Sequence, residues 1–393
     1  MLTILSNARV FAPEDLGIKN LLLGGGRILA VSDDQLEATG AVIIDCEGRT
    51  LIPGFIDGHA HITGGGGENG FSTRVPAPFL SQYTSAGVST VVGVLGTDDT
   101  TRDTRSVVAQ VYALREQGLG VYCHTGGYHV PPVTLTGSVR DDIVFIEPVI
   151  GVGELAISDH RSSQPALEEL LRIASDAHVA GLITGKAGIV HLHLGDGERG
   201  LDLVRRGLEG SELPARVFNP THVNRQSALL EEATALAKRG CYVDATAFPV
   251  DENDPAVDAA DALIQFIDAG GPLEKFTISS DGGGCLPVFD DTGRMTQMGI
   301  GLADELPRTF KSLLDQGMPL AEALSVFTSN PAELLRFNDR GRISLGMRAD
   351  LVLLTEDHAI RDVIVGGQWH VRDGQPVIRG QFEPANASPS ESS

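Results

Sequence analysis

The pattern of hydrophobic and polar positions changes twice along the chain. Residues 1–50 contain short apolar runs broken by Gly and Asp, without helical spacing, which is typical of a small antiparallel sheet. From residue 51, apolar runs of strand length alternate with segments whose apolar residues recur at helical spacing. A strand pattern returns at residues 341–385. We therefore expect both ends of the chain to form one small β domain.

The middle of the chain contains eight strand-like runs separated by helical patterns. Several helical patterns stop at a Gly, as helices commonly do; they lie at residues 104–118, 164–183, 226–240 and 256–270. The strand-like runs lie at residues 51–61, 89–97, 119–127, 145–157, 188–196, 215–223, 241–248 and 275–283. Buried strands that alternate with helices in this way predict an α/β fold with a (β/α)8 TIM-like barrel, and a doubly wound open sheet is the alternative.

These patterns predict two domains and a tail. The barrel takes residues 51–340. A small β-sandwich-like domain takes residues 1–50 and 341–385. The last residues, 386–393, are polar and are expected to be disordered.

Charge and composition exclude several classes of function. The chain carries 30 Lys and Arg against 52 Asp and Glu, a formal net charge of −22, which opposes binding to nucleic acid or to an anionic membrane. The start of the chain lacks the pattern of a secretory signal, and no run reaches the roughly 18 apolar residues of a membrane span. The four cysteines are scattered. We therefore expect a cytoplasmic protein.

Histidines and carboxylates close five of the eight runs, where a barrel gathers its chemistry. His59 and His61, two positions apart on a strand, point to the same face and can bind one ion. A lone histidine at a strand end is more often structural, but the whole set predicts a metal site. Its six residues are His59, His61, Glu154, His193, His222 and Asp281.

This set of ligands is larger than one metal needs. A zinc ion takes about four ligands, so we expect two divalent ions, with Glu154 as the bridge between them. The ions would hold a bridging hydroxide, whose parent water zinc acidifies to a pKa of about 7, and would polarise a carbonyl oxygen. Asp281 would act as ligand and as general acid and base. The predicted chemistry is metal-assisted hydrolysis of an amide-like bond.

The remaining histidines have other expected roles. Those near strand ends that could support the ligands are His124, His129, His160 and His191, and those expected to be structural are His178, His358 and His370.

Several motifs resemble a known family. The marks of the amidohydrolase superfamily are PGFIDGHAH, SSD at the eighth run and GMRADLVLL. Within it the chain resembles the isoaspartyl (β-aspartyl) dipeptidase family over nearly its whole length, through GGGGE, VLGTD, TGGYHVP, AISDHRSS, HLGD, NPTHVNR and SSDGGG. The resemblance implies hydrolysis of β-aspartyl dipeptides and a homo-oligomer as large as an octamer. It also implies that His59, His61 and Asp281 hold the first metal, and that His193 and His222 hold the second.

The resemblance further implies how a dipeptide is held. Glu68 would bind the free α-amino group, Tyr128 would hydrogen-bond the developing oxyanion, Arg161 and Arg225 would grip the carboxylates, and Thr97 would add polar contacts. The substrate's charges support this independently, because one ammonium and two carboxylates want one acid and about two arginines. The glycine run 64–67 would place the acid, since glycine allows close backbone approach and positive φ.

The chain departs from the family pattern at two positions. The commoner pattern has a carboxylated lysine where Glu154 stands, and the nearest lysine in sequence, Lys186, lies beyond the next helix. We expect Glu154 to bridge the metals without CO2. Cys285 stands where serine is expected, and because a thiol donates hydrogen bonds weakly, its contact with a substrate carboxylate would be poorer. An inert loop thiol is the alternative.

Two other functions stay open at this point. The first is another amidohydrolase activity, on cyclic amides or N-acyl amino acids, because metal ligands alone do not choose the substrate. The second is a non-catalytic scaffold, since some barrels of this superfamily serve in assemblies after losing ligands. Glu68, Tyr128 and the two arginines favour a charged dipeptide over an uncharged ring.

Overall fold

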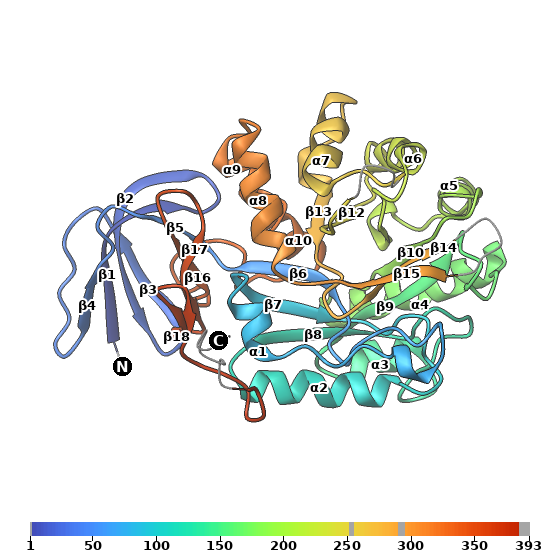
Figure 1. Cartoon of the computed structure of the whole chain (residues 1–393), viewed down its shortest axis with the longest axis horizontal. Coiled ribbons are helices and arrows are strands. Elements are labelled where there is room, and N and C mark those ends of the chain that lie inside the picture. The colour runs from blue at the N-terminus through green and yellow to red at the C-terminus, as the bar shows by residue number, and fades with distance from the viewer. Residues whose placement is uncertain (1, 251–254, 290–294, 385–393) are drawn as a thin grey trace, which may run out of the picture.

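A computed structural model describes residues 2–250, 255–289 and 295–384. Its larger part is a barrel whose parallel strands alternate with helices (Figure 1). The strands are β6 (Phe55–Ala60), β7 (Val88–Gly93), β8 (Gly120–Thr125), β9 (Val149–Ile157), β10 (Val190–Leu194), β11 (Phe218–Thr221), β12 (Val243–Thr246) and β13 (Phe276–Ser279). The helices are α1 (Leu80–Thr84), α2 (Thr104–Glu116), α3 (Val139–Phe145), α4 (Leu167–Thr184), α5 (Asp202–Gly210), α6 (Ser227–Ala237), α7 (Ala259–Asp268), α8 (Glu305–Asp315), α9 (Leu320–Ser325) and α10 (Ser329–Leu334).

Hydrogen bonds between neighbouring strands close this barrel. Strands β6 to β11 form one sheet in sequential order, and β12 pairs with β13. On one side, the amide of His61 donates to the oxygen of Gly282 at 2.8 Å, and the amide of Asp281 donates to the oxygen of His59 at 3.1 Å. On the other side, the amide of Val223 donates to the oxygen of Asp244 at 3.2 Å. The prediction of a (β/α)8 barrel is confirmed, and the open doubly wound sheet is excluded.

Two buried carboxylates reinforce the joints between strands. Asp244 on β12 accepts hydrogen bonds from the hydroxyls of Thr221 at 2.7 Å, Thr277 at 2.6 Å and Ser279 at 2.6 Å, and so links β11, β12 and β13. Asp57 on β6 accepts from the amide of Ser280 at 3.0 Å and from its hydroxyl at 2.5 Å. These bonds stabilise the two edges at which the six-stranded sheet meets the remaining pair.

Both chain ends form a second sheet beside the barrel, as predicted (Figure 1). Its strands are β1 (Leu2–Phe11), β2 (Asp15–Gly24), β3 (Arg27–Ser32), β4 (Val42–Asp45), β5 (Thr50–Pro53), β16 (Leu351–Leu354), β17 (Ile360–Val365), β18 (Gln368–Arg372) and β19 (Gln375–Pro376). Strand β1 pairs with β2 on one edge and with both β4 and β5 on the other, so the sheet branches there. Side chains of β1, β2, β5 and β16 share a core of their own. The expected tail, 386–393, lies outside the described residues.

One predicted run is divided between the two sheets. Residues 51–53 belong to β5 of the terminal sheet, and the barrel begins with Phe55 after Gly54. A Cβ at Gly54 would lie 2.4 Å from Ser89 Oγ, so glycine lets the chain pass close to β7 at the crossing. The run 51–61 was therefore wrong as a single barrel strand, although its second half is β6.

A hairpin that the sequence patterns did not indicate follows β13. Strand β14 (Cys285–Phe289) pairs antiparallel with β15 (Met295–Ile300). Short 3₁₀ helices lie at Phe71–Thr73, Ala215–Val217 and Leu273–Lys275. Within the described ranges, none of the helices combines the length and apolar character needed to span a bilayer.

Replacing Asp244 tests the contribution of the linked strands to stability. In Asp244→Asn an amide nitrogen takes the place of one carboxylate oxygen and faces hydroxyl groups that donated to it. We expect the free energy of unfolding, measured with urea, to fall by about 1–3 kcal/mol, the cost of unsatisfied buried donors. The matched control Asp315→Asn alters an exposed carboxylate paired with Lys311, and it should change stability by less than about 0.5 kcal/mol. Equal effects of the two substitutions would contradict this role.

Candidate metal centre

The six side chains expected to bind metal come together at the carboxyl ends of the barrel strands. They extend from β6, β9, β10, β11 and β13, or from the residue or two that follow. His61 Nε2 lies 3.0 Å and His59 Nε2 lies 3.3 Å from Asp281 Oδ1. Every member of the set is at most 6% exposed: His59, His61, Glu154, His193, His222 and Asp281.

The carboxylate of Glu154 lies between two groups of ligands. Its Oε1 is 3.4 Å from His61 Nε2 and 3.7 Å from His59 Nε2. Its Oε2 is 3.0 Å from His193 Nδ1 and 3.4 Å from His222 Nε2. Each oxygen of one buried carboxylate thus faces its own set of imidazole nitrogens, which is the geometry of a bridge.

A bulge in β9 directs Glu154 into this position. Opposite β10, Val152 pairs with Val190 and Leu155 pairs with Leu192, so β9 holds one residue more than its partner. Such a bulge turns a side chain away from the regular alternation of a strand. Gly153 makes it possible, because its φ is +143° and an added Cβ would lie 2.4 Å from the oxygen of His191. The bulge brings the short glutamate side chain to the centre.

Two of the ligands have unusual backbone conformations. His222 has φ +60° and Asp281 has φ +52°, in the left-handed region that residues with a side chain rarely adopt. Such conformations cost free energy, persist where the surroundings enforce them, and cluster at functional sites. The ring of His222 is also held, with its Nδ1 2.6 Å from Thr246 Oγ1. Thr246 was not among the predicted site residues.

The donor atoms of this site fit divalent cations. His59 Nε2 and Asp281 Oδ1 are buried and have no hydrogen-bond partner among the described residues. Two sets of donor atoms lie within 4.8 Å of one another, namely His59, Glu154 and His222, and His59, His61 and Asp281. Unpaired polar atoms are costly to bury, and a cation bound between them would remove that cost. Imidazole nitrogen with carboxylate oxygen is a donor set that zinc favours.

The charges of the buried side chains also favour a bound cation. Burial opposes ionisation of Glu154, but the nearby His59 and His193 hold the pKa of its carboxyl group well below the usual value. Burial lowers the pKa of His59, yet Glu154 and Asp281 raise it to about 9. The charges of these two carboxylates therefore favour a cation at this position.

Further side chains hold the ligands in place. His59 Nδ1 lies 2.7 Å from His191 Nε2, and His191 Nδ1 lies 2.7 Å from Asn219 Oδ1. This chain leaves Nε2 of His59 directed toward the site. Supporting partners of this kind orient metal-binding histidines in many proteins. His191 was a candidate for such a role, whereas Asn219, next to Pro220 in the sixth run, was missed.

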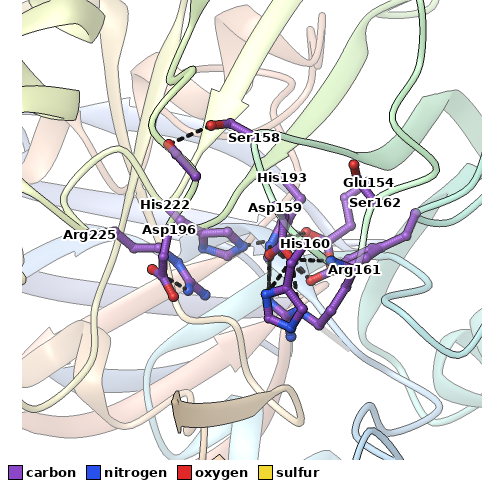
Figure 2. A network of polar contacts seen from close by, with 12 residues as sticks. Glu154, Ser158, Asp159, His160, Arg161, Ser162, His193, Asp196, His222 and Arg225 are labelled. Carbon is purple, nitrogen blue, oxygen red and sulfur yellow. Dashed lines mark hydrogen bonds and ion pairs between the residues drawn. The ribbon is translucent and has the colours of Figure 1, made fainter. Parts of the chain in front are cut away.

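The predicted substrate-binding residues form the rim of the site. Arg161 Nη1 lies 3.4 Å from Glu68 Oε1, and Tyr128 Oη lies 2.8 Å from His193 Nδ1. Arg225 lies on the other side of the centre, with its Nη1 3.4 Å from Asp196 Oδ1 (Figure 2). The structure therefore brings one acid, one phenol and two guanidinium groups to the metal centre.

Thr97 and Cys285 are related to the site through neighbouring residues. Thr97 follows Gly96, where an added Cβ would lie 2.8 Å from His61 Cε1 and 3.6 Å from Glu154 Oε1. Cys285 begins β14, and burial together with the charge of Glu68 raises the pKa of its thiol to about 12. The negative charge of Glu68 thus acts on this thiol.

The glycine run is packed rather than loose. Gly64 has φ +76°, and an added Cβ would lie 2.0 Å from the oxygen of Val75. The amide of Gly65 donates to the oxygen of Gly283 at 2.8 Å. Residues 64–67 thus run between two neighbouring segments with no space for side chains and lead directly to Glu68.

The remaining candidates have partners other than the six expected ligands. His129 pairs with Asp99 at 2.6 Å, and His160 is largely exposed. His124 is buried, with its ring centroid 5.5 Å from that of His191. Lys186 donates from Nζ to the backbone oxygens of residues 143 and 146, at 2.5 and 2.7 Å. The histidines expected to be structural lie on α4 (His178), before β17 (His358) and on β18 (His370).

Comparison with known proteins agrees with this geometry. Residues 50–370 match the amidohydrolase family. The crystal structure of β-aspartyl dipeptidase from Fervidobacterium islandicum AW-1 in complex with β-Asp-Leu dipeptide is 41% identical, with a TM-score of 0.91, and the match covers 98% of this chain and 99% of that one. A second structure of the β-aspartyl dipeptidase from that organism is 40% identical over 98% of this chain and 100% of that one, with a TM-score of 0.87.

Curated relatives are more distant. Adenine deaminase from Deinococcus radiodurans is 26% identical over 93% of this chain, and the chain spans 61% of the length of that relative. Two findings define the family of this chain more narrowly. They are the match of residues 50–370 to the family and the 41% identity to the dipeptidase over nearly the whole of both chains. The chain belongs to the amidohydrolase family and, within it, to the β-aspartyl dipeptidase group.

Proposed function

We propose that this protein hydrolyses β-aspartyl (isoaspartyl) dipeptides with the help of two divalent metal ions. One observation carries the proposal. At a single site, the carboxylate of Glu154 faces two groups of histidines, and one acid and two arginines lie on the rim. A β-aspartyl dipeptide has one ammonium group and two carboxylates around its amide bond. The charges of the rim are complementary to those of this substrate.

Each ligand has a proposed place. His59, His61 and Asp281 would hold the first ion, and His193 and His222 would hold the second. Glu154 would take part in both sites. When bound, divalent ions make a water molecule nucleophilic near neutral pH and polarise a carbonyl oxygen. Nitrogen and carboxylate donors make zinc our choice of metal, and Glu154 makes a carboxylated lysine unnecessary.

The rim residues orient the dipeptide. Glu68 pairs with the α-ammonium group, and Arg161 and Arg225 bind the carboxylates through charge-assisted hydrogen bonds. Tyr128 is a hydrogen-bond donor at neutral pH and lies beside His193, so it donates to the oxygen on which negative charge develops. Thr97 and Cys285 would complete the substrate pocket. An amide held at a fixed angle to the nucleophile has already lost rotational and translational entropy on binding, so less has to be lost in the transition state.

Asp281 moves the proton. Its Oδ1 has no hydrogen-bond partner among the described side chains and faces His59 and His61. A carboxylate at this position accepts the proton of the attacking water and then donates it to the leaving amine. The nitrogen leaves as a neutral amine, which is a much better leaving group than an amide anion.

Three wider predictions accompany this proposal. We propose that the protein is a homo-oligomer, up to an octamer as the family resemblance implies, that it acts in the cytoplasm, and that its partners are small dipeptides rather than nucleic acid or membranes. The division into a barrel of residues 51–340 and a β domain of residues 1–50 and 341–385 also stays a prediction.

Adenine deamination is a second candidate, because curated relatives have that activity in their names. Cyclic amides and N-acyl amino acids are the other substrates that metal ligands of this kind allow. Neither adenine nor a neutral cyclic amide would use the charges of Glu68, Arg161 and Arg225. We therefore favour the dipeptide.

Hydrolysis of β-Asp-Leu beside α-Asp-Leu tests the proposed function. The two isomers have the same charges but place the amide differently relative to them. We expect the purified, zinc-loaded protein to cleave only the β isomer and to leave adenine unchanged, as followed by release of leucine and by chromatography. Cleavage of both isomers, or release of ammonia from adenine, would refute the proposal.

Glu68→Gln tests recognition of the ammonium group. The substitution keeps the shape of the side chain and removes its charge. A hydrogen bond to a charged group is worth about 1.5–3 kcal/mol, so kcat/KM for β-Asp-Leu should fall roughly 10- to 150-fold. Succinyl-leucine, the same compound without the amine, should be affected little. The exposed acid Glu198 offers the control Glu198→Gln, for which we expect no change. An equal loss with both substrates would count against an ammonium site.

A further inference from the structure

A buried carboxylate, Asp159, connects the metal centre to the substrate-binding rim. We propose that Asp159 is a positioning residue that holds Arg161 and His193 at once, and so couples substrate recognition to binding of the second metal ion. The inference rests on the proposed function for its substrate part only. The sequence pattern indicates no role for this residue, although it lies within the stretch AISDHRSS that carries Arg161.

Asp159 grips one edge of the guanidinium group of Arg161. Nε of Arg161 donates to Asp159 Oδ1 at 3.1 Å, and Nη2 donates to Asp159 Oδ2 at 2.7 Å. Two parallel bonds of this kind fix the plane of a guanidinium group as well as its position. The remaining nitrogen, Nη1, faces Glu68, whose Oε1 lies at 3.4 Å. Asp159 therefore sets the direction in which Arg161 presents its charge to the site.

The same carboxylate orients a proposed metal ligand. Asp159 Oδ2 lies 2.9 Å from His193 Nε2, and the opposite ring nitrogen, Nδ1, lies 3.0 Å from Glu154 Oε2 (Figure 2). A carboxylate only accepts hydrogen bonds, and both ring nitrogens face one, so Asp159 and Glu154 compete for the hydrogen of a neutral His193 ring. A hydrogen on Nε2, donated to Asp159, leaves the lone pair of Nδ1 for a metal ion. Asp159 thus favours the tautomer of His193 that suits the second metal.

Neighbouring segments hold Asp159 in this position. Its Oδ1 accepts a hydrogen bond from the amide of Arg161 at 2.7 Å, and its backbone oxygen accepts one from Gln164 Nε2 at 2.8 Å. The loop after β10 makes room for it, since an added Cβ at Gly195 would lie 2.2 Å from Asp159 Oδ2. Asp159 is 4% exposed. Burial with several fixed bonds leaves the carboxylate a single orientation.

This arrangement has a consequence that a merely structural residue would not have. Oδ2 of Asp159 is shared between Arg161 and His193, so loss of one acceptor oxygen disturbs both. Substrate binding and the affinity of the second metal site should then change together in one variant. Arg161 Nη2 also lies 3.4 Å from His193 Nε2, but a guanidinium group only donates hydrogen bonds and cannot accept the hydrogen of Nε2 as Asp159 does. Changes at Arg161 should therefore affect substrate binding more than the second metal site.

Asp159→Asn is the test, because it keeps the shape and removes one acceptor. Metal affinity is measured by competition with a chromophoric zinc chelator, and KM and kcat are measured with β-Asp-Leu. We expect the affinity of the weaker zinc site to fall about 10- to 100-fold, as for other supporting partners of metal ligands, and KM to rise in the same variant. Arg161→Lys should raise KM and lower zinc affinity less than Asp159→Asn does.

Two further variants keep the test decisive. Asp99→Asn alters another buried carboxylate that faces a histidine, His129 at 2.6 Å, and is expected to change neither KM nor zinc affinity. Gly195→Ala displaces Asp159 without changing its charge, so it should reproduce the combined defect even if Asp159→Asn fails to fold. If Asp159→Asn or Gly195→Ala changes zinc affinity no more than Asp99→Asn does, the proposal is wrong. If the unaltered protein does not cleave β-Asp-Leu, the proposed function fails while the zinc measurement still decides the role of Asp159.

Discussion

The site depends on one buried negative charge, the carboxylate of Glu154. A charge this far from water is costly unless opposite charge or hydrogen-bond donors compensate it. Histidine nitrogens face both of its oxygens, and the pKa of His59 is raised to about 9 by this acid and by Asp281. Other features keep the histidine nitrogens beside this charge. They are the bulge at Gly153, the left-handed backbone at the ends of β11 and β13, and the hydrogen-bond partners behind the histidines.

Closure of the barrel makes such an arrangement possible. Ligands from five strands can meet only if the strands end on a common ring, and the first and last strands have to be adjacent for His59 to reach Asp281. Asp57 and Asp244 hold the strands together where the backbone ladder is interrupted. The polar groups that close the barrel are thus distinct from those proposed to bind metal, since neither Asp57 nor Asp244 belongs to the proposed ligand set.

Much of this architecture could be predicted from the sequence because it has a local signal. Strand runs, helical spacing and the histidines that close the runs are local patterns, and they lead to the barrel and to the six residues that the structure brings together. Contacts between distant segments have no such signal. The division of the first run at Gly54 depends on the approach of β7, and the partners Asn219, Thr246 and Asp159 become visible only when neighbouring strands are in register.

The central claim is that Glu154 bridges two cations without a carboxylated lysine. Anomalous diffraction at the zinc edge, from crystals of protein stripped of metal and reloaded with zinc in bicarbonate-free buffer, tests it most directly. We predict two peaks, one beside each oxygen of Glu154, with His59 and His61 at the first and His193 and His222 at the second. A single peak, or a second peak that forms only after bicarbonate is added, would contradict the claim.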